Sequence, residues 1–513
     1  MSDTTTDAPP ALIEEKMPRA HKLTIGALLV AAFVMILNET IMNVALTPLR
    51  EEFQVSETVI QWLTTAFMLT LAVVIPTTGF MIQRFSLRAV FTAAMVLFIV
   101  GTALCAGAPG FGFLVAGRVV QAAGTAIMLP LMMTTVLTLV PLRRRGVVMG
   151  NIAIVISVAP ATGPALSGLI LHLADWRWMF LTILPIAVIA LLLGRPRLDA
   201  TPGTAGERLN IPSLLLAVPG FGGLVYGISQ IGGGHGTEDL DAAEGGVDPY
   251  ALIALAVGLI CLVSFALLQI RLQKSNSALL NLKPFKYTMF TRALAMMLLM
   301  MIALFGALII LPMFLQQARG LGTLETGLLM LPGGVLMALM APPVGRLYDK
   351  VGPKPLVIPG ASILILSLFT MSLLSPETPT LAILGLHVVL SSGLALLFTP
   401  CFTTAMNPLP QPLYSHGSAA LNTLQQLAAA IGTAALVAVM GIGAAMAASQ
   451  GLSPEEAELE GFSTAFRTAA LMSIGTLILG GTLRATKAED DEEDDEEGAD
   501  EVEIEQAPEK ETS

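Results

Sequence analysis

Long apolar runs, separated by short polar or glycine- and proline-containing segments, recur along almost the whole chain. A membrane-spanning helix needs about 20 mostly apolar residues, and the sequence contains fourteen windows of this kind. They cover residues 23–44, 59–79, 89–108, 113–140, 147–171, 178–194, 211–231, 250–270, 293–314, 326–344, 355–374, 380–401, 418–447 and 464–483. The pattern predicts an all-α polytopic membrane protein with fourteen transmembrane helices.

The composition agrees with this prediction. Of the 513 residues, 54% are hydrophobic and 13% charged, whereas soluble domains carry about 25% charged residues. Cys105, Cys261 and Cys401 all lie in apolar runs without a nearby cluster of metal-ligating residues, so we expect neither a metal site nor a disulfide framework. The first apolar run is too long for a cleavable signal and should stay in the mature protein.

Lysine and arginine lie mostly on one side of the predicted spans. With the N-terminus placed in the cytoplasm, 22 of the 27 Lys and Arg residues fall in inner segments, four in outer loops and one, Arg118, within a span. Positively charged short loops stay in the cytoplasm, so we expect both termini there and the protein in the cell membrane.

Two polar segments carry much of the acidic charge. Residues 489–511 hold fifteen acids and one base, and we expect the tail 485–513 to be disordered because it has little apolar surface to bury. The acidic, glycine-rich outer loop 232–249 is interpreted as a solvated connection without chemistry of its own.

One short inner turn occurs twice, 266 residues apart. The first copy contains Gly79, Arg84 and Arg88, and the second contains Gly345, Asp349, Lys350 and Gly352. The offset equals eight spans, which indicates two six-helix halves with two helices inserted between them. We therefore predict a cytoplasmic segment 1–22, a first half 23–194, two linker helices 211–270, a second half 293–484 and the tail 485–513.

The repeated turn resembles the signature of the major facilitator superfamily, Gly-x-x-x-Asp-Arg/Lys-x-Gly. The second copy follows this pattern, whereas the first has Gln83 in place of the acid and Ser86 in place of the second glycine. The resemblance implies that these loops hold the two halves in one of their gating states.

Further segments are similar to the fourteen-span drug:proton antiporter branch of the EmrB/QacA type. Residues 37–46 resemble the branch sequence Leu-Asp-x-Thr-Ile-Val-Asn-Val-Ala-Leu, and Arg118 begins a segment similar to Arg-x-x-Gln-Gly-x-Gly. Gly163, Pro164 and Gly168 match its antiporter motif, which the resemblance connects with leak and directionality. A plain packing seam is the alternative interpretation of that small-residue stripe.

Two strongly ionisable residues, Glu39 and Arg118, lie inside predicted spans. Charge at this depth is costly and predicts a functional site. Both residues lie about five positions from the outer ends of their spans, so they could pair. We interpret them as proton-coupling residues, and a fixed structural ion pair is the alternative. In the branch the acid stands one residue earlier, where this chain has Asn38, and that shift rotates a side chain by about 100°.

Several uncharged or weakly basic side chains are candidates for a substrate cavity. These are Asn38, Asn43, Gln61, Gln121, Asn422, Gln425 and His387. Hydrogen bonds between helices explain them about equally well.

The sequence contains no Walker motif, GxSxG elbow or HExxH segment, so we predict neither an enzyme nor direct use of ATP. The predicted function is secondary export of a hydrophobic, cationic or amphipathic compound driven by inward proton movement, as in multidrug efflux and antibiotic resistance. We expect a monomer in the lipid bilayer, with no cofactor and no nucleic-acid partner. A narrow exporter of one endogenous metabolite and a non-coupled facilitator or channel are the alternatives.

Overall fold

The computed structural model describes residues 18–60, 62–141, 144–198, 210–233, 249–273 and 278–484. Within these ranges it is almost wholly helical and contains no strand. The fourteen helices of at least 18 residues are α1 (Arg19–Phe53), α3 (Trp62–Arg84), α4 (Leu87–Ala106), α5 (Phe111–Leu139), α6 (Arg145–Leu173), α7 (Arg177–Gly194), α8 (Ile211–Gly233), α9 (Pro249–Leu272), α10 (Thr288–Met313), α11 (Thr323–Val351), α12 (Lys354–Met371), α13 (Thr380–Met406), α14 (Tyr414–Ser449) and α15 (Pro454–Thr482). The short α2 (Glu57–Ile60) precedes α3.

Thirteen helices in the described ranges are long and apolar enough to cross a membrane, and α6 contains a shorter apolar stretch over Arg145–Ile156. Each predicted window corresponds to one of the fourteen long helices. The prediction of an all-α polytopic membrane protein is therefore confirmed. The tail 485–513 and Gln61 lie outside the described residues, as does most of the loop 232–249.

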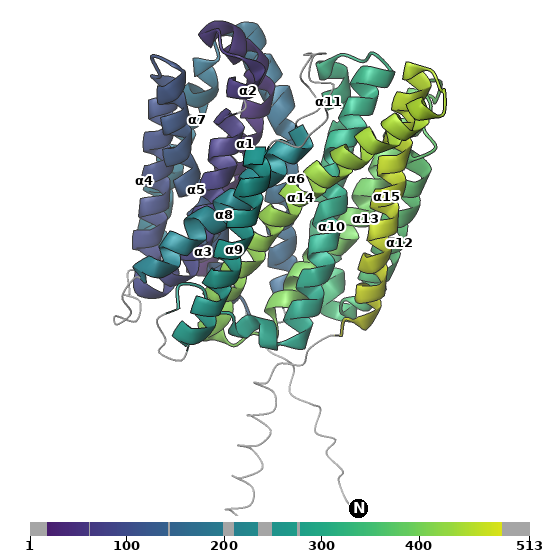
Figure 1. Ribbon diagram of the computed structural model, residues 1–513. Coiled ribbons are helices and arrows are strands. Elements are labelled where there is room, and N and C mark those ends of the chain that lie inside the picture. The colour runs from purple at the N-terminus through teal and green to yellow at the C-terminus, as the bar shows by residue number, and fades with distance from the viewer. Residues whose placement is uncertain are drawn as a thin grey trace, which may run out of the picture.

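The helices form two groups that lie side by side (Figure 1). One group contains α1 and α3 to α7, and the other contains α10 to α15. The inserted helices α8 and α9 pack against each other, and α8 also packs against α3 of one group and α14 of the other. The structure thus has the two six-helix halves and two inserted helices that the repeat predicts.

Both described termini lie at the same end of the bundle, which we call the base (Figure 1). The start of α1 is held there by the Thr24 hydroxyl, which donates to the carbonyl of Arg197 at 2.7 Å. Arg88, at the start of α4, donates from Nε and Nη2 to the carbonyl of Leu198 at 3.0 and 2.8 Å. Three segments of the first half are therefore joined at the base.

Local sequence determines where several helices begin and end. The Ser86 hydroxyl accepts a hydrogen bond from the Ala89 amide and caps α4, which satisfies one of the free donors at a helix start. Gly352 follows α11 with φ +74°, a conformation that is easily reached only without a Cβ. Ser453 and Glu456 form a capping box at the start of α15. Ser86 and Gly352 lie in the two copies of the repeated turn, and each of them keeps its copy short.

Small residues let α4 and α5 approach closely. A Cβ added to Gly101 would overlap the backbone of Gln121, and one added to Gly124 would overlap the backbone of α4 at Ala94. Without a hydrophobic effect between helices in lipid, such close packing supplies much of the association energy. The seam also places Gln121 directly against α4.

The two halves meet at the base along two edges. At the α6–α11 edge, Gly146 and Gly345 are in backbone contact, and Gly150 packs against Ala341. At the α3–α14 edge, Gly79 lies against the imidazole of His416. The base is closed because glycine at these positions removes the side chains that would separate the helices.

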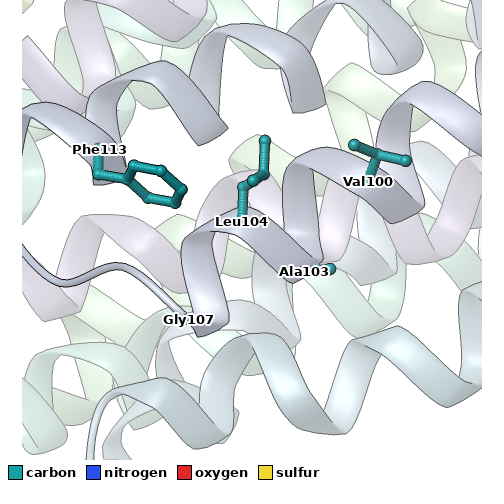
Figure 2. Close-up of a pocket in the computed structure, with 5 residues that line it drawn as sticks. All are labelled: Val100, Ala103, Leu104, Gly107 and Phe113. Atoms are coloured by element: carbon teal, nitrogen blue, oxygen red, sulfur yellow. The ribbon is translucent and has the colours of Figure 1, made fainter.

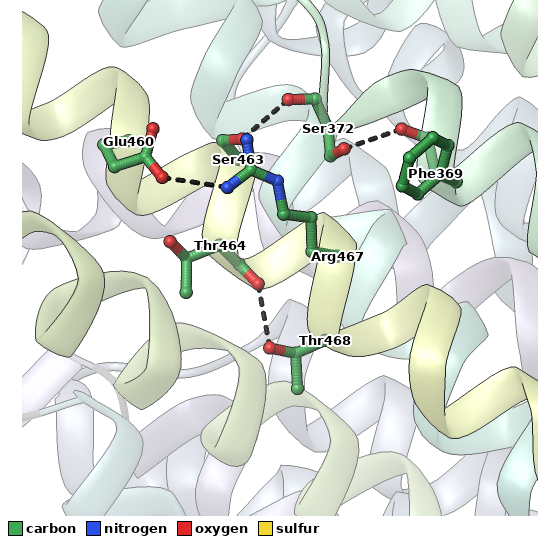
Figure 3. Close-up of polar contacts among 7 residues, drawn as sticks. All are labelled: Phe369, Ser372, Glu460, Ser463, Thr464, Arg467 and Thr468. Carbon is green, nitrogen blue, oxygen red and sulfur yellow. Dashed lines mark hydrogen bonds and ion pairs between the residues drawn. The ribbon is translucent and has the colours of Figure 1, made fainter.

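At the opposite end of the second half, α15 is tied to the end of α12 (Figure 3). The Ser463 hydroxyl donates to the Ser372 carbonyl at 2.6 Å, while Arg467 and Glu460 of α15 form an ion pair at 3.1 Å. Because both charged side chains are more than 40% exposed, this pair contributes at most about 1 kcal/mol.

We expect the substitution Gly345→Ala to destabilise the closed base, because the new methyl group would overlap the Gly146 carbonyl. Overpacking of this kind costs about 1–3 kcal/mol, and a lowered thermal unfolding midpoint of the purified protein in detergent would measure it. Gly385→Ala is the matched control, since a Cβ there meets nothing within 4 Å. Equal midpoints for the two variants would contradict the close contact.

Candidate functional site

A cluster of polar side chains surrounds Arg118 in the interior of the first half. Its Nη1 donates to Gln121 Oε1 at 2.7 Å and to Asn38 Oδ1 at 3.3 Å. Gln121 Nε2 in turn donates to the Thr102 hydroxyl at 2.8 Å. The cluster therefore joins α1, α4 and α5 through side chains that are all buried.

The guanidinium in this cluster has neutral partners. Arg118 is 1% exposed, and its Cζ lies 4.0 Å from the centroid of the Phe67 ring on α3, which adds a cation–π contact. Its buried Nε has no hydrogen-bond partner among the described residues. A buried cation without a hydrogen-bonded carboxylate is costly, so the cluster remains a candidate functional site.

Glu39 lies next to this cluster but is not part of it. No hydrogen bond or ion pair holds its carboxylate among the described residues, and the residue is partly exposed. Asn38, one position earlier, faces Arg118 in its place. In this conformation Glu39 and Arg118 do not form the fixed structural ion pair that was the alternative interpretation of the sequence.

The antiporter-motif helix α6 packs against α1 beside Glu39. A Cβ on Gly163 would overlap the hydroxyl of Thr40, and that hydroxyl lies 3.4 Å from the Ala159 carbonyl of α6. Gly168 has open space around its Cα. Pro164 lies in α6 and Asn43 in α1, but their side chains are outside the described part of the structure.

The other cavity candidates lie in the second half and bond mainly to neighbouring helical groups. Asn422 donates to the Ser418 carbonyl of its own helix at 2.8 Å. Gln425 Nε2 lies 3.1 Å from the sulfur of Met297. His387 is buried, and its Nε2 lies 3.1 Å from the Met330 carbonyl on α11. The structure does not bring these residues together with Arg118.

The second copy of the repeated turn binds the start of α6. Asp349 accepts hydrogen bonds from the backbone amides of Gly146 at 2.9 Å and Val147 at 3.2 Å. An acid is favourable there because the first amides of a helix are free and the helix dipole is positive. Lys350 beside it is exposed. Asp349 thus joins the two halves at the base.

The first copy makes a neutral contact with the start of α14. Gln83 Nε2 donates to the Pro412 carbonyl at 2.8 Å, and Gln83 Oε1 lies 3.1 Å from His416 Nε2. Arg84 lies over the rings of Phe80 and Phe85. The replacement of the family's acid by Gln83 therefore preserves a contact between the halves without charge.

Two residues of this base contact were not predicted from the sequence. Arg145, counted there as one of several inner positive charges, is 5% exposed, and its Nη2 donates to Leu137 O at 2.8 Å and to Tyr414 Oη at 2.9 Å. His416 lies outside the predicted window 418–447. The polar run at the start of α14 is the signal that could have identified His416.

Comparison with known proteins agrees with the geometry. Residues 28–433 match the family described as Major Facilitator Superfamily. The chain belongs to the major facilitator superfamily. It is a membrane transporter and not an enzyme, as the motifs predict.

Some similar curated proteins carry resistance names, and another is named as a transporter. This major facilitator is 37% identical over 417 residues to the lincomycin resistance protein LmrB of Bacillus subtilis (strain 168), covering 81% of this chain and 85% of the relative. It is 38% identical over 470 residues to the uncharacterized MFS-type transporter YcnB of the same strain, covering 92% and 96%. The multidrug resistance protein B homolog of Mycobacterium tuberculosis (strain CDC 1551 / Oshkosh) is 28% identical over 420 residues, covering 80% and 74%.

Solved structures share the fold at low sequence identity. The human organic anion transporter MFSD10 (TETRAN) superposes with a TM-score of 0.64 at 14% identity, covering 90% of this chain and all of that chain. The proton:xylose symporter XylE superposes with a TM-score of 0.62 at 16% identity, covering 91% and 97%. These likenesses support the fold of this major facilitator.

A hollow at the end of α4 and the start of α5 is less suited to a transported compound than the interior (Figure 2). It is lined by Val100, Ala103, Leu104, Gly107 and Phe113. None of these side chains can form a hydrogen bond or carry charge, and Val100 and Phe113 are exposed. We therefore interpret the hollow as lipid-facing surface.

We expect Gln121→Leu to destabilise this major facilitator, because it leaves the Arg118 Nη1 and the Thr102 hydroxyl without their shared partner. Leaving a buried charged donor with one bond fewer costs about 1–3 kcal/mol, which thermal unfolding in detergent would detect. Gln121→Glu keeps the acceptor for Arg118 and should be less destabilising. A larger loss of stability in Gln121→Glu than in Gln121→Leu would contradict this role of the amide oxygen.

Proposed function

We propose that this protein is a proton-coupled exporter of hydrophobic, cationic or amphipathic compounds that works by alternating access. It lies in the cell membrane as a monomer, with the base and both termini in the cytoplasm. The resistance names of its relatives support an exported drug as cargo, and the excess of Lys and Arg on the inner side supports the orientation. The division into 23–194, 211–270 and 293–484 gives two moving halves and a linker pair.

The observation that carries the proposal is the unpaired carboxylate of Glu39. An acid held in an ion pair would stay ionised, whereas Glu39 has no hydrogen-bonded partner among the described residues and is partly exposed. Arg118 is bound by Asn38 and Gln121 instead. Glu39 is therefore free to accept and release a proton, or to attract a cationic cargo.

Exchange follows from competition at this carboxylate. A protonated Glu39 is neutral and does not attract a cation, while the ionised form does. Cargo leaving from the ionised form lets a proton bind, and release of the proton on the other side lets the next cargo bind. One acid can thus couple the two movements without both ligands being bound together.

Helix α6 connects the surroundings of Glu39 with the contacts that close the base. This helix contacts α1 beside Glu39 at Thr40, and its first amides are bound by Asp349 of the second half. A change in packing around Glu39 therefore acts on a helix that also closes the base. We infer that opening the base breaks the Asp349 and Gln83 contacts while the opposite end closes.

We expect Glu39→Gln to remove export driven by a pH gradient while leaving the protein folded. The amide has the size of the carboxyl group but carries no exchangeable charge at this position. Uptake of lincomycin into proteoliposomes with an imposed pH gradient, with the transporter reconstituted in both orientations, should fall at least about tenfold, an effect of about 1.4 kcal/mol on the coupled step.

Glu39→Asp keeps the acid and should retain part of the gradient-driven uptake. Gradient-driven uptake by Glu39→Gln at the wild-type rate would place the proton site elsewhere, with His387 and Asp349 as the next residues to substitute. Uptake by the wild type that is independent of the gradient would favour a facilitator in which Glu39 is structural.

A further inference from the structure

The two inserted helices α8 and α9 bury polar side chains against each other. Ser213 of α8 and Gln269 of α9 are both 0% exposed, and Gln269 Nε2 donates to the Ser213 hydroxyl at 2.8 Å. That hydroxyl donates to Asn210 Oδ1 at 2.9 Å. Buried polar groups within an apolar helix pair are costly unless they are bonded, so this pair is well satisfied.

The hydrogen-bonded chain continues into the segment that leads to the second half. Gln269 Oε1 accepts from the backbone amide of Leu280 at 3.2 Å. The next amide, of Asn281, donates to His416 Nδ1 at 3.3 Å. Both bonds fix the backbone of the connecting segment against α9 on one side and α14 on the other.

His416 joins this chain to the contact between the halves. Because its Nδ1 accepts from Asn281, a neutral imidazole carries its hydrogen on Nε2 and donates to Gln83 Oε1 at 3.1 Å. Gln83 then donates to the Pro412 carbonyl. His416 is 4% exposed, so water does not readily replace these bonds.

We propose that Gln269 and His416 are positioning residues through which the α8–α9 pair stabilises the closed base. The chain from Ser213 to Gln83 touches both halves and requires α3, α14 and the connecting segment to lie together at the base. When α3 and α14 separate, His416 loses Gln83 or moves away from Asn281. The chain therefore belongs to one of the two conformations, and the inserted helices contribute to the equilibrium between them.

Apolar packing places the pair where it can act in this way. Phe80 of α3, Phe221 of α8, Phe265 of α9 and Ala419 of α14 belong to one buried apolar cluster. The Phe221 and Phe265 rings pack edge to face with centroids 5.9 Å apart. The pair thus covers the α3–α14 edge, and its polar chain lies on the base side of that edge.

The test measures the distance between the two halves at the base, in nanodiscs without cargo and at one fixed pH. Spin labels are placed on Ala89→Cys and Lys354→Cys, which are exposed positions in different halves, after the three native cysteines are replaced by alanine. We expect Gln269→Leu to raise the ratio of open to closed base by roughly three- to tenfold, the effect of about one net hydrogen bond.

Gln273→Leu is the matched control. It makes the same change at the first residue after α9, where the side-chain Nε2 has no hydrogen-bond partner, and it should leave the distances unchanged. A Gln269→Leu distribution equal to that of Gln273→Leu would overturn the proposal. Should Gln269→Leu fail to give a monodisperse protein, Ser213→Ala replaces it with a smaller expected shift in the same direction.

A double variant separates coupling from a local structural effect. His416→Leu breaks the same hydrogen-bonded chain at the contact between α3 and α14. Adding Gln269→Leu to this variant should therefore open the base little further. Independent, additive shifts would overturn the coupling. The inference rests on the alternating access of the proposed function, but not on the role of Glu39. Asp349→Asn removes the charge from the Asp349 contact between the halves and should open the base by itself. If Asp349→Asn opens the base and Gln269→Leu does not, the proposed function stands and this inference fails.

Discussion

The hydrocarbon interior of a membrane offers no water to hydrogen-bond with polar groups, and this constraint shapes the molecule. Backbone groups are satisfied within helices, and the helices attract one another by close packing at glycine, as between α4 and α5. Polar side chains are then gathered into a few buried sets. One surrounds Arg118 inside the first half, and another runs from Ser213 to Gln83 at the base.

Both copies of the repeated turn bind the start of a helix in the other half, but through different chemical groups. Asp349 uses a charged oxygen to bind the free amides at the start of α6. Gln83 uses an amide group to bind the Pro412 carbonyl and an imidazole at the start of α14. Duplication placed both turns against a helix start, and the residues at one position decided whether the bond between the halves carries charge.

The fold was predictable because it depends on the length of each apolar segment and on the spacing of one repeated turn, and both can be read directly from the sequence. Apolar length gave the helices, and the offset between Gly79 and Gly345 gave the inserted pair. The polar contacts were less predictable, because a window uncertain by a few residues does not fix the rotation of a helix. Asn38 faces Arg118 where pairing with Glu39 was open, since one position on a helix is about 100° of rotation.

Other contacts depend on partners that are remote in sequence. Arg145 has the charge pattern of an ordinary inner loop, but Tyr414, 269 positions later, covers it. Thr102 is a common residue in apolar helices, and only the α4–α5 seam brings it to Gln121. Neither the burial of a charge nor the partner of a hydroxyl can be derived from local hydropathy.

The unequal chemistry of the two base edges has a mechanical consequence. Backbone amides bound to a carboxylate form charge-assisted bonds, which are roughly twice as strong as neutral ones, so the polar contact at the α6–α11 edge is stronger than the one at the α3–α14 edge. We infer that separation of the halves begins at the α3–α14 edge and that the Asp349 contacts of the α6–α11 edge break last. The inserted helix α8 contacts both α3 and α14, so it lies across the edge that separates first.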